Sequence, residues 1–138
     1  MKQVKQDGLT YLINEKEEKA EIIGYYEDRN NYLIPRSINH ESQEYIVKSI
    51  STNAFKTSLT IKSIEFASDS ELQTIEKDAF KYSTIESIFL PASLIDLKEE
   101  WCANTQKLTK INVDPRNSRY LYFEDKMIIC KTSEKSDN

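Results

Sequence analysis

The sequence predicts an α/β solenoid, a stack of short parallel strands joined by short helical turns and capped by β-hairpins. The first observation is an apolar run of the form Ile/Leu-x-x-Ile-x-apolar that occurs three times between Ile61 and Val113. The second is its spacing, because Ile64 and Ile88 are 24 residues apart and Ile88 and Ile111 are 23 apart. A repeat at this period is typical of solenoids, in which each copy stacks on its neighbours.

Each apolar run is expected to form one short strand of a parallel sheet. Side chains alternate between the two faces of a strand, so Ile64 and Phe66 point into the core while their neighbours point outward. The outward positions of the three copies are the candidate partner-binding residues: Ser63, Glu65, Ser87, Phe89, Lys110 and Asn112. An exposed phenylalanine among polar neighbours suits an anchor in a small interface. The alternative is that Phe89 packs against a flanking loop.

The other half of each copy carries an Ala-Phe pair, at residues 54–55 and 79–80, which Trp101-Cys102 replaces in the third copy. These segments are too short for a long helix and are expected to form one or two helical turns. One copy cannot fold alone, because five buried apolar side chains contribute roughly 8–15 kcal/mol. Ordering about 24 residues costs on the order of 1–2 kcal/mol for each backbone unit. Stability must therefore come from stacking, and both ends need caps.

The chain is long enough for one domain, which the pattern divides into four segments. Residues 1–49 are predicted to be an N-terminal β cap with a degenerate repeat, and residues 50–113 hold about three repeat copies. Residues 114–130 are predicted to form a C-terminal β-hairpin cap, and residues 131–138 a disordered tail. Two β-like runs joined by a charged turn predict a hairpin over residues 9–23. The alternative for the N-terminal segment is a separate small domain. The alternative to the solenoid is an ordinary α+β domain in which the spacing is coincidental.

One longer motif is more specific: Ile-x-x-x-Ala-Phe followed by Ile/Leu-x-x-Ile-x-Leu-Pro-x-Ser-Leu, as in residues 75–94. It resembles the repeats of the BspA-like leucine-rich repeat proteins. The resemblance covers about residues 45–130, and residues 97–105 and 114–120 are similar to a protist subgroup. It implies a leucine-rich-repeat-like stack and a non-enzymatic surface antigen or adhesin. Such a protein would bind a host or matrix protein through the strand face.

The chain departs from the family pattern in two ways that matter. Ser51, Glu76 and Lys98 stand where glycine usually follows the repeat isoleucine, so this turn has to form without a residue that tolerates positive φ. Family members generally carry many more copies, so the resemblance implies a short or truncated member. The alternative function is therefore a structural or truncated repeat fragment with no ligand of its own.

Composition and charge limit the partners. The formal net charge is −4 and the sequence pI is about 5.1, with lysines scattered among glutamates. Nucleic acid and anionic membranes call for a basic face, so neither is expected. No stretch approaches the length of a membrane span, and the first residues lack the apolar core of a secretory signal. The resemblance implies a location at the cell surface, whereas the sequence shows neither a membrane span nor a secretory signal. The sequence therefore leaves the compartment open.

Residue types needed for catalysis or cofactor binding are sparse, so an enzyme has the least support. His40 is the only histidine and lies in a polar segment, which leaves a tetrahedral zinc site short of ligands. Only Gly8 and Gly24 are present, which excludes Gly-x-Ser-x-Gly nucleophiles and phosphate-binding glycine loops. Cys102 and Cys130 are expected to be buried free thiols, with one bridge between them as the alternative. No catalytic residue, metal or cofactor is predicted.

Overall fold

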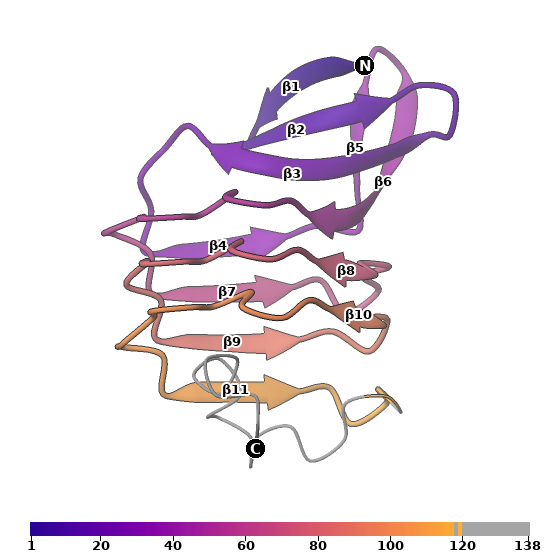
Figure 1. Cartoon of the computed structure of the whole chain (residues 1–138). Helices are drawn as coiled ribbons and strands as arrows, with labels where there is room; N and C mark the ends of the chain where they lie inside the picture. The colour runs from indigo at the N-terminus through magenta and orange to yellow at the C-terminus, as the bar shows by residue number, and fades with distance from the viewer. Residues whose placement is uncertain (118, 120–138) are drawn as a thin grey trace.

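The structure is a computed structural model of the chain, and it describes residues 1–117 and 119. This part of the chain contains strands and turns but no helix. The strands are β1 (Lys2–Gln6), β2 (Leu9–Asn14), β3 (Lys19–Tyr25), β4 (Asn31–Ile34), β5 (Ser37–His40), β6 (Gln43–Ile50), β7 (Ser63–Phe66), β8 (Thr74–Ile75), β9 (Ser87–Leu90), β10 (Asp96–Leu97) and β11 (Lys110–Val113). Figure 1 shows successive coils stacked below the N-terminal strands.

One wall of the solenoid is a four-stranded parallel sheet in the order β11-β9-β7-β4. Ile64 pairs with Ile88 and Ile88 pairs with Ile111, so the repeat isoleucines lie side by side. Their side chains are buried. The predicted stack of parallel strands is therefore confirmed. β4 adds a further rung, because Tyr32 pairs with Ile64 in the same register.

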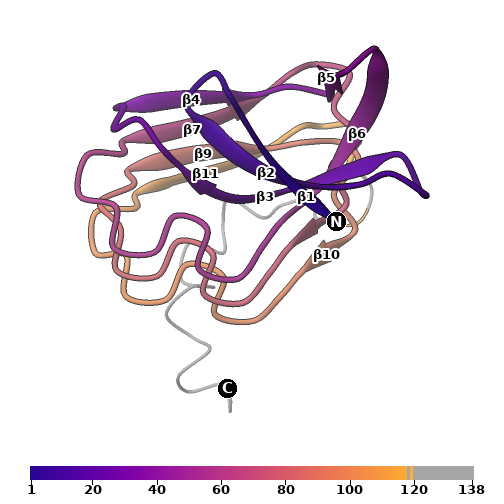
Figure 2. The same cartoon turned by 90° about the horizontal axis from the view of Figure 1, so that it is seen from above.

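The second wall is a seven-stranded sheet in the order β1-β2-β3-β6-β8-β10, with β5 paired to β6. β1, β2 and β3 pair antiparallel, whereas the ladder from β3 through β6 and β8 to β10 is parallel. In the view from above, β1–β3 cross the end of the stack, with the four-stranded sheet on one side (Figure 2). Their inward side chains are buried: Leu9, Tyr11, Ile13 and Ile22. The N-terminal strands thus cover the apolar end of the solenoid.

The prediction of short helical turns is wrong, because the Ala-Phe half of each coil is a series of β-turns. We number the coils by the repeat copies, so the first coil carries Ala54-Phe55 and the third carries Trp101-Cys102. In the first coil, the Ala54 N–H donates to the Ser51 carbonyl at 3.1 Å, and the Ser58 N–H donates to the Phe55 carbonyl at 3.2 Å. Between them, the Phe55 N–H donates to the Ala79 carbonyl of the next coil at 2.7 Å. A helix would use such N–H groups within its own segment. Here they hold neighbouring coils together instead.

Two residues in each coil adopt the left-handed backbone conformation, which also interrupts any right-handed helix. Their φ angles lie between 57° and 66°, and they are Asn53, Thr57, Asp78, Tyr82, Glu100 and Asn104. Ser51, Glu76 and Lys98, which replace the family glycine, do not have positive φ. The first left-handed residue of each coil lies two positions after them, at Asn53, Asp78 and Glu100.

Thr57→Gly should stabilise the protein by about 1 kcal/mol. A left-handed conformation costs a non-glycine residue roughly 1–2 kcal/mol, and the extra backbone freedom of glycine in the unfolded chain offsets part of that gain. Among the described residues, the Thr57 hydroxyl donates only to the Lys56 carbonyl, at 2.6 Å, in an exposed position. Urea unfolding followed by the fluorescence of Trp101, the single tryptophan, measures the change. Lys56→Gly is the matched control, because Lys56 has no positive φ, and it should lose roughly 0.5–1 kcal/mol. Equal losses in both variants would contradict this account.

A row of aromatic rings runs through the core along the stack. The rings of Phe55 and Phe80 are parallel, with centroids 5.1 Å apart. Tyr25 of β3 stacks on Phe55 at 5.8 Å, and Trp101 meets Phe80 edge-on at 6.0 Å. Offset and edge-on pairs of this kind contribute about 0.5–1.5 kcal/mol beyond the area they bury. The row therefore couples the N-terminal strands to three successive coils.

Cys102 is buried and disulfide-bonded, so the expectation of a free thiol at this position is wrong. Spacing in the sequence cannot show which sulfur atoms come within bonding distance, because that depends on how distant segments pack. Cys130, the hairpin predicted for the remainder of residues 114–130 and the tail predicted over residues 131–138 lie outside the described residues.

Candidate functional site

The outer face of the four-stranded sheet is the candidate binding face, and strand pairing arranges its side chains in two columns. The first column runs Asn31, Ser63, Ser87, Lys110. In the second column Leu33 pairs with Glu65 and Phe89 pairs with Asn112. Glu65 and Phe89 each follow the paired residues Ile64 and Ile88 and line the same hollow, so they join the two halves of this column. Because side chains alternate along each strand, both columns point away from the core. Column members on directly paired residues lie about 4.7–4.9 Å apart, the usual distance between paired strands.

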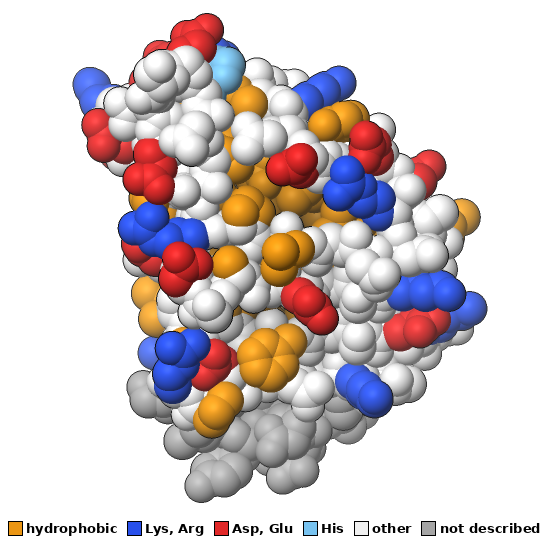
Figure 3. Space-filling view, turned by 180° about the vertical axis from the view of Figure 1, so that it is seen from behind, with side chains coloured by type: hydrophobic (Ala, Val, Ile, Leu, Met, Phe, Trp, Pro, Cys, Tyr) orange, Lys and Arg blue, Asp and Glu red, His pale blue; other side chains and the backbone are white. Residues whose placement is uncertain are grey.

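The six residues predicted from the repeat pattern all lie in these two columns. Phe89 is 42% exposed, whereas Ile88 and Leu90 beside it are buried. Seen from the side of this sheet, hydrophobic and acidic side chains follow one another along the middle of the face (Figure 3). The sequence interpretation missed Leu33, which is 63% exposed on β4. The apolar-x-apolar-Pro pattern of residues 32–35 is the signal that would have included it.

Two hollows flank Phe89. The larger measures about 370 Å³ and extends over β7, β9 and β11, with Ser63 and Ser87 among its lining residues. The smaller, about 160 Å³, lies toward Pro91 and Asp114. Phe89 lines both. The serines are short, so the surface is depressed between the longer side chains around them.

Two charged groups on this face are free to meet a partner. Within residues 1–117 and 119, neither Glu65 nor Lys110 forms an ion pair. In the first column, the Ser63 hydroxyl donates to Asn31 Oδ1 at 2.5 Å. The face thus combines two exposed apolar side chains with one unpaired carboxylate and one unpaired ammonium group.

Potential metal ligands do not gather into a site in the described part of the chain. His40 lies on β5, and its Nε2 is 3.7 Å from Glu41 Oε2. Across the part of the chain that the structure describes, no group of three or more His, Cys, Asp or Glu residues could hold a metal ion. The same residues include no helix with the length and apolar character of a membrane span. The side chains of the strand face can form hydrogen bonds, ion pairs and apolar contacts.

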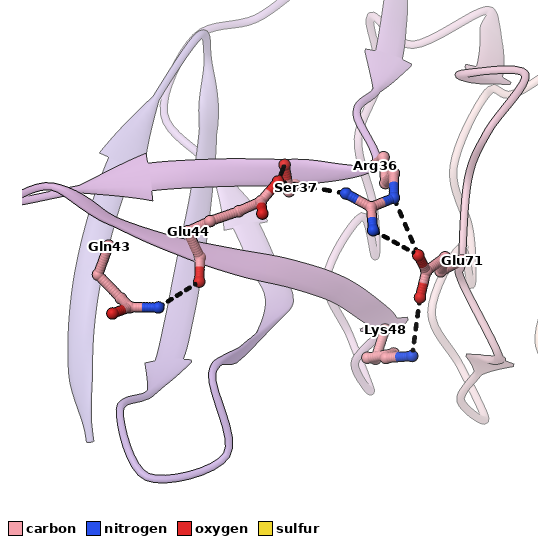
Figure 4. A network of polar contacts seen from close by, with 6 residues as sticks. All are labelled: Arg36, Ser37, Gln43, Glu44, Lys48 and Glu71. Atoms are coloured by element: carbon pink, nitrogen blue, oxygen red, sulfur yellow. Dashed lines mark hydrogen bonds and ion pairs between the residues drawn. The ribbon is translucent and has the colours of Figure 1, made fainter.

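A charged network ties the β5–β6 hairpin to the loop before β8 (Figure 4). Arg36 Nη2 lies 2.7 Å from Glu71 Oε2, and Lys48 Nζ lies 3.3 Å from Glu71 Oε1. Arg36 Nη1 also contacts Glu44 Oε2 at 3.2 Å. Hydrogen bonds from Arg36 and Lys48 lower the pKa of Glu71. The network holds the hairpin against the coil that follows it.

Glu71→Gln should reduce the acid sensitivity of the fold. The folded pKa of Glu71 lies below its ordinary value of 4.5, so its ionised form stabilises the protein above pH 4.5 and loses that contribution as the pH falls through the folded pKa. The variant should be less stable than the wild type at neutral pH and lose less stability between about pH 5 and pH 3. Urea midpoints across this range measure the effect. Glu99→Gln, an exposed carboxyl outside the network, is the control. Parallel pH profiles for all three proteins would contradict the role of Glu71.

Comparison with known proteins agrees with this architecture. Residues 30–125 match the family described as the BspA type leucine rich repeat region (6 copies). No curated protein matches the chain. Among solved structures, a leucine-rich repeat protein from Bacteroides capillosus is 18% identical with a TM-score of 0.58, and the match covers 83% of this chain and 99% of that protein. The pneumococcal vaccine antigen PcpA is 20% identical with a TM-score of 0.51.

Several of these proteins are much longer than the chain. The match to PcpA covers 83% of this chain and 38% of PcpA. A leucine-rich repeat protein from Bacteroides ovatus is 17% identical with a TM-score of 0.45, and its match covers 79% of this chain and 40% of that protein. At these identities the likeness to solved structures concerns the fold.

Proposed function

Because this chain belongs to the BspA-type leucine-rich repeat family, we propose that it is a non-enzymatic protein-interaction domain whose four-stranded face binds a host or matrix protein at the cell surface. The family generally mediates protein–protein interaction and is typically non-enzymatic. The observation that carries the proposal is Phe89, a half-exposed aromatic side chain between two hollows. In this role the chain acts as a surface antigen or adhesin.

The side chains of the face suit noncovalent binding of a partner protein. Aromatic anchors surrounded by polar groups carry much of the binding free energy in protein interfaces. Phe89 and Leu33 supply apolar area, while Glu65 and Lys110 supply charges that orient a partner. The solenoid holds these side chains on strands that have a paired neighbour on both sides at β7 and β9, which supports a face that is formed before binding.

Binding of the purified chain to host cells and to wells coated with matrix proteins tests the proposal. We expect saturable binding that Phe89→Ala and Glu65→Lys each weaken about tenfold or more, because truncating a central anchor or reversing a contacting charge removes a major contribution. Glu99→Lys, a charge reversal on an exposed turn away from the face, is the matched control and should bind like the wild type. Unchanged binding by both face variants would rule out this face as the site.

The second candidate function is that of a structural repeat domain without a ligand of its own. The observation that favours it is the row of buried rings and the hydrogen bonds between coils, which hold the coils together as a scaffold. A folded wild-type chain that shows no saturable binding to cells or matrix proteins would favour this alternative.

A further inference from the structure

We infer that the partner presents an amphipathic α-helix laid along the stack axis, with a basic residue between two apolar residues at positions i, i+3 or i+4, and i+7. This partner class rests on the proposed function, because it names the chemistry that the same face would bind. The residues that carry it are Leu33, Glu65 and Phe89, which lie on three adjacent strands, β4, β7 and β9. We call these three residues the reading column.

The spacing of the reading column matches a helix. Leu33 and Phe89 are two strands apart, which corresponds to about 9.6 Å at a strand separation of about 4.8 Å. Residues i and i+7 of a helix are about 10.5 Å apart along its axis. Side chains on one face of an extended peptide recur about every 6.7 Å, so three of them span about 13 Å. A helix therefore reaches all three positions to within about 1 Å, whereas an extended peptide misses by about 4 Å.

Glu65 determines the charge that the central helix residue should carry. Its side chain is exposed and, among the described residues, forms no ion pair. Apolar contacts at Leu33 and Phe89 would exclude water on both sides of the carboxylate, which strengthens its attraction for a lysine or arginine. An acidic residue at this position would meet a like charge and be rejected. The reading column thus favours the order apolar, basic, apolar.

The neighbouring column leaves room for a helix. Ser63 and Ser87 lie beside Glu65 and Phe89 within the hollow of about 370 Å³. A helix with its side chains is about 10–12 Å wide, so it would overlap both columns rather than follow one alone. Lys110 continues the serine column on β11 and has no ion pair in the described part of the chain. An acidic residue on that flank of the helix would pair with it.

Two peptide libraries panned against the immobilised chain test this partner class. One displays a helical scaffold randomised at positions i, i+3, i+4 and i+7, and the other displays unstructured linear peptides. We expect the helical library to yield binders with Lys or Arg at i+3 or i+4 between apolar residues. Glu65→Lys should reverse the central preference to Asp or Glu, and Phe89→Ala should weaken the selected helices at least tenfold. Glu99→Lys should change neither result.

The outcomes distinguish an error in the helical partner class from an error in the proposed binding face. Binders that Phe89→Ala and Leu33→Ala leave unaffected would overturn both the partner class and the proposed function. Binders that require Phe89 but are extended, or whose central residue does not respond to Glu65→Lys, would overturn the helix and leave the proposed function standing. A helical library that enriches nothing on the folded wild type would also overturn the helix. Circular dichroism and thermal midpoints establish beforehand that each variant is folded.

Discussion

Phe80→Ala should destabilise the protein by about 3–5 kcal/mol, a large part of the stability of a small domain. Phe80 is completely buried, and its ring lies between those of Phe55 at 5.1 Å and Trp101 at 6.0 Å. Alanine removes both ring contacts and leaves a cavity between coils. Because solenoid stability is a sum of contacts between neighbours, a cavity at this position weakens the coupling of the first coil to the third.

Urea and thermal unfolding, followed by circular dichroism and Trp101 fluorescence, measure this loss. The emission of Trp101 should also shift to longer wavelength, because its ring loses the contact with Phe80. Phe89→Ala is the matched control, since it removes the same side chain from an exposed position and should cost at most about 1 kcal/mol. A loss at Phe89 equal to that at Phe80 would contradict the placement of Phe89 on the outer face.

Asn117→Ala should destabilise the protein by about 2–4 kcal/mol. Asn117 is almost completely buried, and its Nδ2 donates to the carbonyls of Pro91 at 2.9 Å and Leu94 at 3.1 Å. Its Oδ1 accepts from the Arg119 N–H at 2.8 Å. Alanine would remove the donor for two carbonyl groups of the preceding coil, and each buried polar group left unsatisfied costs about 1–3 kcal/mol. One amide side chain thus joins two coils.

Urea unfolding compares this variant with two others. Asn117→Asp keeps the oxygen that accepts from Arg119 but loses the Nδ2 donor, so it should lose at least as much stability as the alanine variant. Asn112→Ala removes an exposed asparagine from β11 and should stay within about 0.5 kcal/mol of the wild type. An aspartate variant as stable as the wild type would show that the two carbonyls do not depend on Asn117.

The candidate face was largely predictable because it follows from the alternation of side chains within single strands. Ile64 and Ile88 are buried, while Glu65 and Phe89 beside them are exposed, as the pattern requires. Leu33 was missed because its strand lies in the divergent segment before the first regular copy. Its place in the reading column became evident only from the pairing of β4 with β7.

Local periodicity was therefore sufficient to define the parallel strands, their spacing and the side chains that face outward, because these are properties of one strand and its repeat. The turns required the folded structure. The Phe55 N–H can bond within its own segment or to the next coil, and only the stacked coils show that it donates to Ala79. The hollows beside Phe89 likewise depend on side chains brought together from separate coils. Such contacts depend on how neighbouring coils pack, and the sequence of a single copy does not determine that packing.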